Sequence, residues 1–316
     1  MNKTFKKILI ALGVSLAFML GYSLMQLLFT LAFMLYYSVT AAGADLTDVH
    51  GSGRIEKIMY YVQQKTLGQT GLIVLISGLI SIAIMLLVIL LLKKKNKWDM
   101  AKIFNIPHKF PNALFLGIAC FLLGIIFNVG FVNLMGFIPF PESWIEANNE
   151  SVGAILSGNL VAALLATSLM APVAEEIIFR GVFYTMFRDA LPVRRRIAVL
   201  ISCLIVSIVF GVYHGNILQG LYTFLFSILL VLIYERTGSI WSPILVHAGF
   251  NSAWLLEMFF ARLFAEDKAL VHGIVFTAMA LLLTAGVFLL SGYGKKDTAE
   301  GDHESADPAD HSDLNS

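Results

Sequence analysis

The stretch Ala171-Pro-Val-Ala-Glu-Glu-Ile-Ile-Phe-Arg-Gly181 places two adjacent carboxylates and a guanidinium inside a long apolar run. Apolar residues precede the stretch and resume directly after it. An unpaired charge at the centre of a bilayer costs about 3 kcal/mol or more. Packing alone does not require such charges. Glu175, Glu176 and Arg180 therefore indicate a functional site with partners elsewhere in the chain.

The composition indicates whether this site is surrounded by water or by lipid. Of the 316 residues, 58% are hydrophobic and 14% are charged, and the mean hydropathy is +0.80. Soluble domains carry about 25% charged residues, and long apolar runs cross a membrane as helices. We therefore expect an all-α, polytopic membrane protein. The net charge of +1 gives no basic field for nucleic acid. Cys120 and Cys203 lie in apolar runs, which favours buried thiols over a disulfide.

Apolar runs predict about eight transmembrane helices. They are expected at about residues 8–39, 70–92, 112–138, 153–187, 197–213, 220–234, 240–260 and 271–290. Lysines before the first run and small residues after it resemble a signal peptide. The run is about twice the usual length for that, which favours a retained span. The fourth run would measure ~50 Å as one straight helix, against a hydrocarbon core of ~30 Å. We expect Pro172 to kink or restart this helix, or its end to project into the cytosol.

Loop charges predict the topology. Basic residues at 93–97 and 194–196 place these loops in the cytoplasm, and the acidic loop at 142–150 fits the outer face. Both termini are then expected in the cytoplasm. We expect three regions. Residues 1–150 form an N-terminal region of three spans that contains a cytoplasmic basic loop, and residues 151–291 form a core. Residues 292–316 form a disordered acidic tail in the cytoplasm.

Ionisable residues within the predicted spans form a small set. Its members are Glu175, Glu176, Arg180, His214, His247 and Glu257, with Asn251 as a polar companion. Three pairs at i,i+4 spacing share a helix face: Glu176 with Arg180, Phe210 with His214, and His247 with Asn251. Taken singly, each residue has a structural explanation as an intrahelical ion pair, an interhelical hydrogen bond or an interfacial charge. Taken together, they converge only if their spans pack around a common polar cavity.

This set of side chains suits hydrolysis. A carboxylate can take a proton from water, and histidines can position that water, bind a metal or donate to an oxyanion. An arginine can hold the orientation of a glutamate, and an asparagine can hydrogen-bond a carbonyl. The sequence contains no H-E-x-x-H zinc motif and no G-x-S-x-G serine motif.

Three motifs in order carry a family resemblance. Glu175-Glu176-x-x-x-Arg180, Phe210-x-x-x-His214 and His247-x-x-x-Asn251 resemble those of the CAAX-prenyl-protease and bacteriocin-processing (CPBP) family of intramembrane endopeptidases. That family includes type II CAAX prenyl endopeptidases and lysostaphin-resistance-like proteins. The resemblance covers about residues 156–254, and makes the predicted core a CPBP-like protease core. The resemblance implies a catalytic set and two supporting residues. The catalytic set is Glu175, Glu176, His214, His247 and Asn251, and the supporting residues are Arg180 and Phe210.

Our hypothesis assigns a role to each group. Glu175 activates water and His214 orients it, His247 and Asn251 stabilise the oxyanion, and Glu176 pairs with Arg180. The family is usually described as metal-dependent. Zinc held by Glu175, His214 and His247 is therefore one alternative, and water activated without a metal is the other.

Two other classes of protein could use the same residues. A proton-coupled transporter also places Glu and His at mid-membrane, and a non-catalytic scaffold or bacteriocin self-immunity protein could bind a peptide in the cavity. The substrate of a protease of this kind would be a membrane-associated peptide or protein. Counting residues from the cytoplasmic side gives depths of ~16 Å for Glu176, ~10 Å for His247 and ~27 Å for His214, so the sequence alone does not place them at one level.

Overall fold

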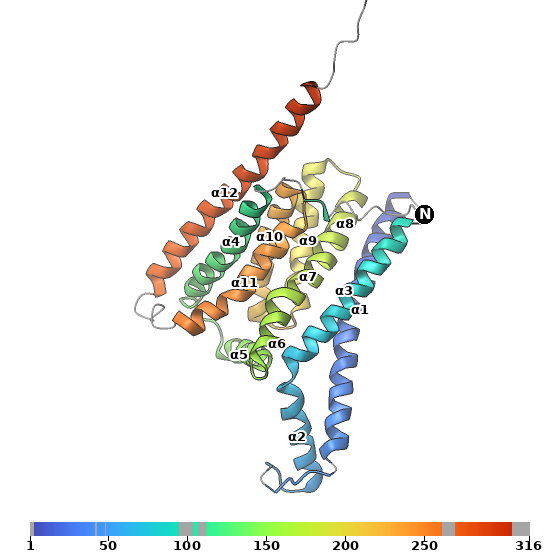
Figure 1. Ribbon diagram of the computed structural model, residues 1–316, viewed down its shortest axis with the longest axis vertical. Helices are drawn as coiled ribbons and strands as arrows, with labels where there is room; N and C mark the ends of the chain where they lie inside the picture. Colours follow the sequence, from blue (N-terminus) through green and yellow to red (C-terminus); the bar gives the residue numbers. More distant parts are fainter. Residues whose placement is uncertain are drawn as a thin grey trace, which may run out of the picture.

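The computed structural model describes residues 3–41, 43–47, 49–94, 104–106, 112–260 and 269–304, with side chains omitted at 92–94, 256–260 and 292–304. The described chain is a bundle of long helices without strands, as the composition predicts (Figure 1). The elements are α1 (Lys3–Ala41), α2 (Arg54–Leu67), α3 (Thr70–Lys94), α4 (Asn112–Met135), α5 (Glu142–Leu156), α6 (Leu160–Leu165), η2 (Ala166–Met170), α7 (Ala171–Glu176), η3 (Ile177–Tyr184), α8 (Thr185–Ala190), α9 (Arg195–Tyr213), α10 (Ile217–Thr237), α11 (Trp241–Phe260) and α12 (Ala269–Glu304).

The helices account for the predicted membrane spans. Within the described residues, 7 helical segments are long and apolar enough to cross a membrane. The remaining predicted span, at 240–260, corresponds to α11, whose side chains are described only as far as Leu255. The chain is thus a multi-pass membrane protein with a number of spans close to eight.

Two segments differ from the sequence prediction. The acidic segment at 142–150, predicted as a loop, is part of helix α5, which follows Pro141 and carries Glu142 in its first turn. A carboxylate in the first turn is favourable beside the positive end of a helix dipole. α12 continues to Glu304, so its backbone is helical at the start of the tail predicted to be disordered over 292–316. A helix that is already formed gains one hydrogen bond for each added residue. Residues 305–316 lie outside the described residues.

The fourth predicted span is one helical segment, Leu160–Ala190, of 31 residues. Two π-helical stretches, η2 and η3, lie on either side of the short helix α7, which carries Pro172 near its start. In η2, the Ala171 N–H donates to the Ala166 carbonyl, five residues back. The wider π turn lets the helix continue past a proline, and π turns are frequent at functional sites.

Close helix packing fixes the position of α11. A Cβ atom at Gly124 of α4 would lie 1.9 Å from the Val246 carbonyl oxygen, and one at Gly249 of α11 would lie 2.0 Å from the Phe121 oxygen. Glycine at these two positions lets the backbones of α4 and α11 approach to contact, as small residues do between membrane helices. Val246 and Gly249 lie on either side of His247 in the sequence, so this packing also fixes the height of His247.

An ion cluster joins three helix ends on one side of the bundle. Glu235 of α10 pairs with Arg188 of α8 and, at 3.0 Å, with Arg195 of α9. The start of α1 and the described end of α12 lie at the same end of the bundle as the α8–α9 turn (Figure 1).

Candidate active site

A buried ion pair lies at the centre of the bundle. The Glu176 and Arg180 side chains are both 0% exposed, and Arg180 Nη1 lies 2.9 Å from Glu176 Oε1. Arg180 Nη2 also donates to the hydroxyl of Ser227, at 2.7 Å, and to its carbonyl, at 3.1 Å. The Arg180 guanidinium lies 4.8 Å from the centre of the Phe210 ring. These contacts with α9 and α10 hold Arg180 in place, so the pair is part of a network rather than an isolated intrahelical bridge.

His247 joins the two glutamates. Its Nδ1 lies 2.8 Å from Glu176 Oε1, and its Nε2 lies 3.8 Å from Glu175 Oε2. A carboxylate accepts hydrogen bonds, so the Nδ1 atom donates to Glu176, and Nε2 is the ring nitrogen that faces Glu175. The imidazole packs edge-on against Phe226 and Phe210, with ring centroids 5.4 Å and 6.0 Å away. Glu175 itself is 13% exposed, and it is the more open of the two carboxylates.

His214 is oriented by the end of α9. Its Nδ1 donates to the Phe210 carbonyl at 2.8 Å, which satisfies one of the carbonyls that a helix end leaves without a backbone donor. The Nε2 atom is thereby left as the acceptor of neutral His214. His214 interacts electrostatically with Glu175 and with His247. In both histidines, Nδ1 makes the hydrogen bond that orients the ring, and Nε2 is the other ring nitrogen.

Asn251 is bound to the π turn. Its Nδ2 donates to the Thr167 carbonyl at 2.8 Å. The Ala171 N–H donates to the Ala166 carbonyl, and Pro172 has no N–H. Neither residue can therefore donate a backbone hydrogen bond to the Thr167 carbonyl. Asn251 supplies the donor that this carbonyl needs. One of its amide protons therefore has a structural use, and the other proton remains for the predicted contact with an oxyanion.

The structure brings most of the predicted residues to one level. Phe210 contacts Arg180, His214 and His247, so the last turn of α9 lies beside η3 and α11. The depth count for His247 took α11 to begin at the membrane surface. Ser239 and Ile240, directly before α11, are buried at 2% and 0% exposure, so α11 begins against other parts of the bundle, and the depth of His247 in the membrane stays a prediction. The Glu257 side chain lies outside the described residues.

The central part of the chain is similar to a known protein family. Residues 157–253 match the family model described as "Type II CAAX prenyl endopeptidase Rce1-like". This segment resembles the Rce1-like family. The match contains all three motifs and confirms the resemblance that they predicted.

A further similarity is to a bacterial protein. The Bacillus subtilis (strain 168) protein named "Putative membrane peptidase YdiL" is 25% identical over 159 residues. That match covers 49% of this chain and 59% of the relative, so the chain spans about three fifths of the relative's length. No solved structure gives a significant match. At the level of the family, these similarities support a membrane peptidase.

Some residues that contact the Rce1-like motifs have no strong signal in the sequence. Ser227 binds Arg180, Phe226 packs on His247, and Thr167 accepts from Asn251. A serine or threonine in an apolar span is common, because its hydroxyl can bond within its own helix. Only the structure distinguishes these three residues from the many others of their kind.

The described side chains do not form a group of three or more His, Cys, Asp or Glu placed to hold a metal ion. Zinc held by Glu175, His214 and His247 would require three metal-binding atoms around one point, as in catalytic zinc sites. His247 Nδ1 is occupied by Glu176, and its Nε2 lies 3.8 Å from Glu175. Zinc held by Glu175, His214 and His247 therefore stays a prediction, and we derive no step through a metal.

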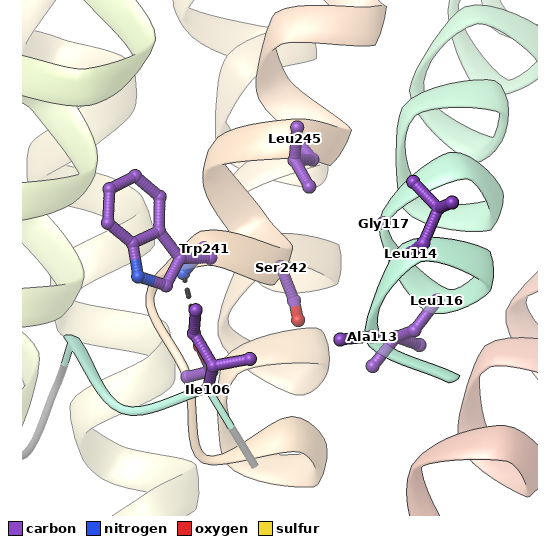
Figure 2. A pocket seen from close by; sticks show the side chains of 9 residues that line it. Ile106, Ala113, Leu114, Leu116, Gly117, Trp241, Ser242 and Leu245 are labelled. Atoms are coloured by element: carbon purple, nitrogen blue, oxygen red, sulfur yellow. Dashed lines mark hydrogen bonds between the residues drawn. The ribbon is translucent and has the colours of Figure 1, made fainter. Parts of the chain in front are cut away.

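Two cavities accompany the site. One, of about 320 Å³, lies between the starts of α4 and α11 and is lined by Ile106, Ala113, Leu114, Leu116, Gly117, Ser239, Trp241, Ser242 and Leu245 (Figure 2). It contains none of the predicted catalytic residues. A second, of about 500 Å³, lies along the α9–α10 hairpin, and Gly215 and Asn216 in its wall directly follow His214 in the sequence.

Proposed function

We propose that this chain is an intramembrane endopeptidase that hydrolyses a peptide bond of a membrane-associated peptide or protein. The observation that carries the proposal is the arrangement Glu176–His247–Glu175, in which one imidazole joins a fully buried carboxylate and a more open one. A histidine held by a buried carboxylate has a defined tautomer and orientation, which is the arrangement that proton transfer needs.

Glu176 and Arg180 act as the fixed support of the site. Arg180 neutralises Glu176 and is itself tied to Ser227. Glu176 in turn accepts from His247 Nδ1. Neither Glu176 nor Arg180 reaches solvent, so their part in the reaction is to keep His247 Nε2 directed towards Glu175.

Glu175 and His214 act on the water. Glu175 takes a proton as the water oxygen bonds to the carbonyl carbon of the substrate, and His214 Nε2 accepts the second O–H of the same water. The carbonyl oxygen becomes an oxyanion, to which the second Asn251 amide proton and, in its imidazolium form, His247 Nε2–H would donate. Glu175 then returns its proton to the leaving nitrogen as the C–N bond breaks. The products are a carboxylic acid and an amine, and the residues are regenerated.

The topology forms part of this proposal. We propose that both termini face the cytoplasm. The basic loops at 93–97 and 194–196 support this orientation, and so does the position of the start of α1 and the described end of α12 at one end of the bundle (Figure 1).

The test is a comparison of membrane peptides from cells that carry the wild-type chain, Glu175→Ala or Glu150→Ala. Glu150 is an exposed acidic residue of α5 and serves as a matched control. We expect specific cleavage products in wild-type and Glu150→Ala cells that are missing from Glu175→Ala cells at equal protein levels. Identical peptide patterns in all three would instead favour a transporter, a scaffold or a self-immunity protein.

A further inference from the structure

Helix α1 lies outside the Rce1-like segment but packs against its reactive part. Tyr22, near the middle of α1, is 2% exposed and belongs to the same apolar cluster as Ala174, Ile178 and Phe179. These three residues lie on either side of Glu175 and Glu176 in the sequence. α1 thus covers the Rce1-like core where the two glutamates lie.

The Tyr22 hydroxyl is buried, and its proton has no acceptor among the described residues. A buried donor without an acceptor is costly, so its retention needs a reason. The strongest charge that acts on this hydroxyl is Glu175, and the Gln26 amide, one turn further along α1, is placed to donate a weak hydrogen bond to the hydroxyl oxygen. The unused donor thus lies in the field of a carboxylate for which the described residues show no hydrogen bond.

A second contact ties α1 to the site. Ser23 Oγ and Tyr213 Oη are 2.8 Å apart, which fixes α1 against α9 at the residue before His214. The Tyr213 hydroxyl also interacts electrostatically with Glu175, and its ring packs on Phe179 at 5.5 Å. This bond sets the height of α1 relative to the site, and so the position of Tyr22.

We propose that Tyr22 is a positioning residue for Glu175: its hydroxyl donates a hydrogen bond to the Glu175 carboxylate during the reaction and holds that carboxylate towards the water. This inference rests on the proposed function. It extends the site to a helix outside the family segment, since the three motifs lie in α7, η3, α11 and the end of α9 with the residue that follows it.

A double-mutant cycle in proteoliposomes tests the inference. The probe is the peptide whose cleavage differs most between wild-type and Glu175→Ala cells, synthesised with a fluorophore and a quencher on either side of its cleavage site. The enzymes are wild type, Tyr22→Phe, Glu175→Asp and the double variant, with Tyr36→Phe as the control. Tyr36 lies on the same helix and is 61% exposed.

We expect Tyr22→Phe to lower kcat by roughly tenfold to a hundredfold, as for the loss of a hydrogen bond to a charged group, with KM unchanged. In the Glu175→Asp background, the same change should cost less than about twofold, because the bond depends on the position of the carboxylate. Because the change removes a buried donor without an acceptor, thermal unfolding in detergent should occur at a temperature no lower than that of Tyr36→Phe.

Two results would overturn the inference: a Tyr22→Phe kcat equal to that of wild type, or equal fold-losses in both backgrounds, which indicate a structural role. A different result identifies failure of the proposed function itself. If Glu175→Ala cleaves the probe at the wild-type rate, hydrolysis does not depend on this site, and the inference falls with it.

Discussion

Removal of the Arg180 charge should destabilise the protein strongly. Arg180→Met keeps much of the side-chain volume but leaves the Glu176 carboxylate, which is 0% exposed, without its cation. Breaking a buried ion pair from one side costs about 3–5 kcal/mol, because an uncompensated charge stays in a low-dielectric interior. Ser227 also loses its guanidinium donor. We therefore expect a loss near 4 kcal/mol.

Two controls separate this effect from others. The double variant Arg180→Met/Glu176→Gln removes both charges and should recover part of the loss, since replacing a whole buried pair is far less costly. Arg195→Met breaks a pair whose arginine is 63% exposed, and should cost only about 0.2–1 kcal/mol. The assay is the free energy of unfolding in mixed micelles, measured by denaturant titration of purified protein. A loss below about 1 kcal/mol in Arg180→Met, or a double variant less stable than the single one, would refute the reasoning.

Three further predictions follow from the packing and from the donor set. Gly249→Ala should push α11 away from α4, since the new Cβ would lie 2.0 Å from a backbone oxygen. The melting temperature and the cleavage rate should both fall. Gly286→Ala is the control: a Cβ there meets nothing within 4 Å, so both quantities should stay unchanged. Asn251→Ala leaves the Thr167 carbonyl without its donor and should lower the free energy of unfolding by about 1–3 kcal/mol. An unchanged free energy of unfolding would show that this hydrogen bond does not stabilise the fold. If zinc is held at the site as the family resemblance implies, elemental analysis should find about one zinc per chain, less in His214→Ala, and chelation should stop cleavage. Full activity without zinc after chelation would contradict the zinc prediction.

The fold could be predicted from the sequence because the bilayer restricts the alternatives. Apolar runs long enough to span it fold as helices, and the predicted spans correspond to the observed helices. The predictions that failed concern segments expected to lie outside the lipid. The loop predicted at 142–150 is helical, and α12 runs on into the predicted tail. In these segments, the charge pattern served to predict the side of the membrane. It carried little information on the backbone conformation.

The site could be predicted in part because charge in lipid is costly. Glu176, Arg180 and His247 were expected to find partners, and their network is in the structure. The bond from Asn251 to Thr167 could not be predicted, since it depends on a π turn that shifts the hydrogen bonds around Pro172. Tyr22 gave no signal for a different reason. A tyrosine in a span is typical of apolar packing, and only the tertiary structure places it in the field of Glu175.

The central claim is that Glu175 activates the water in a site oriented by Glu176 and His247. The most direct measurement is the initial rate of probe cleavage by purified Glu175→Ala in proteoliposomes, beside wild type and Glu150→Ala at equal amounts of folded protein. Loss of a positioned general base costs about 10²–10⁴-fold. We predict a loss of at least about a hundredfold for Glu175→Ala, with Glu150→Ala at the wild-type rate. A Glu175→Ala protein that cleaves as fast as wild type would contradict the account.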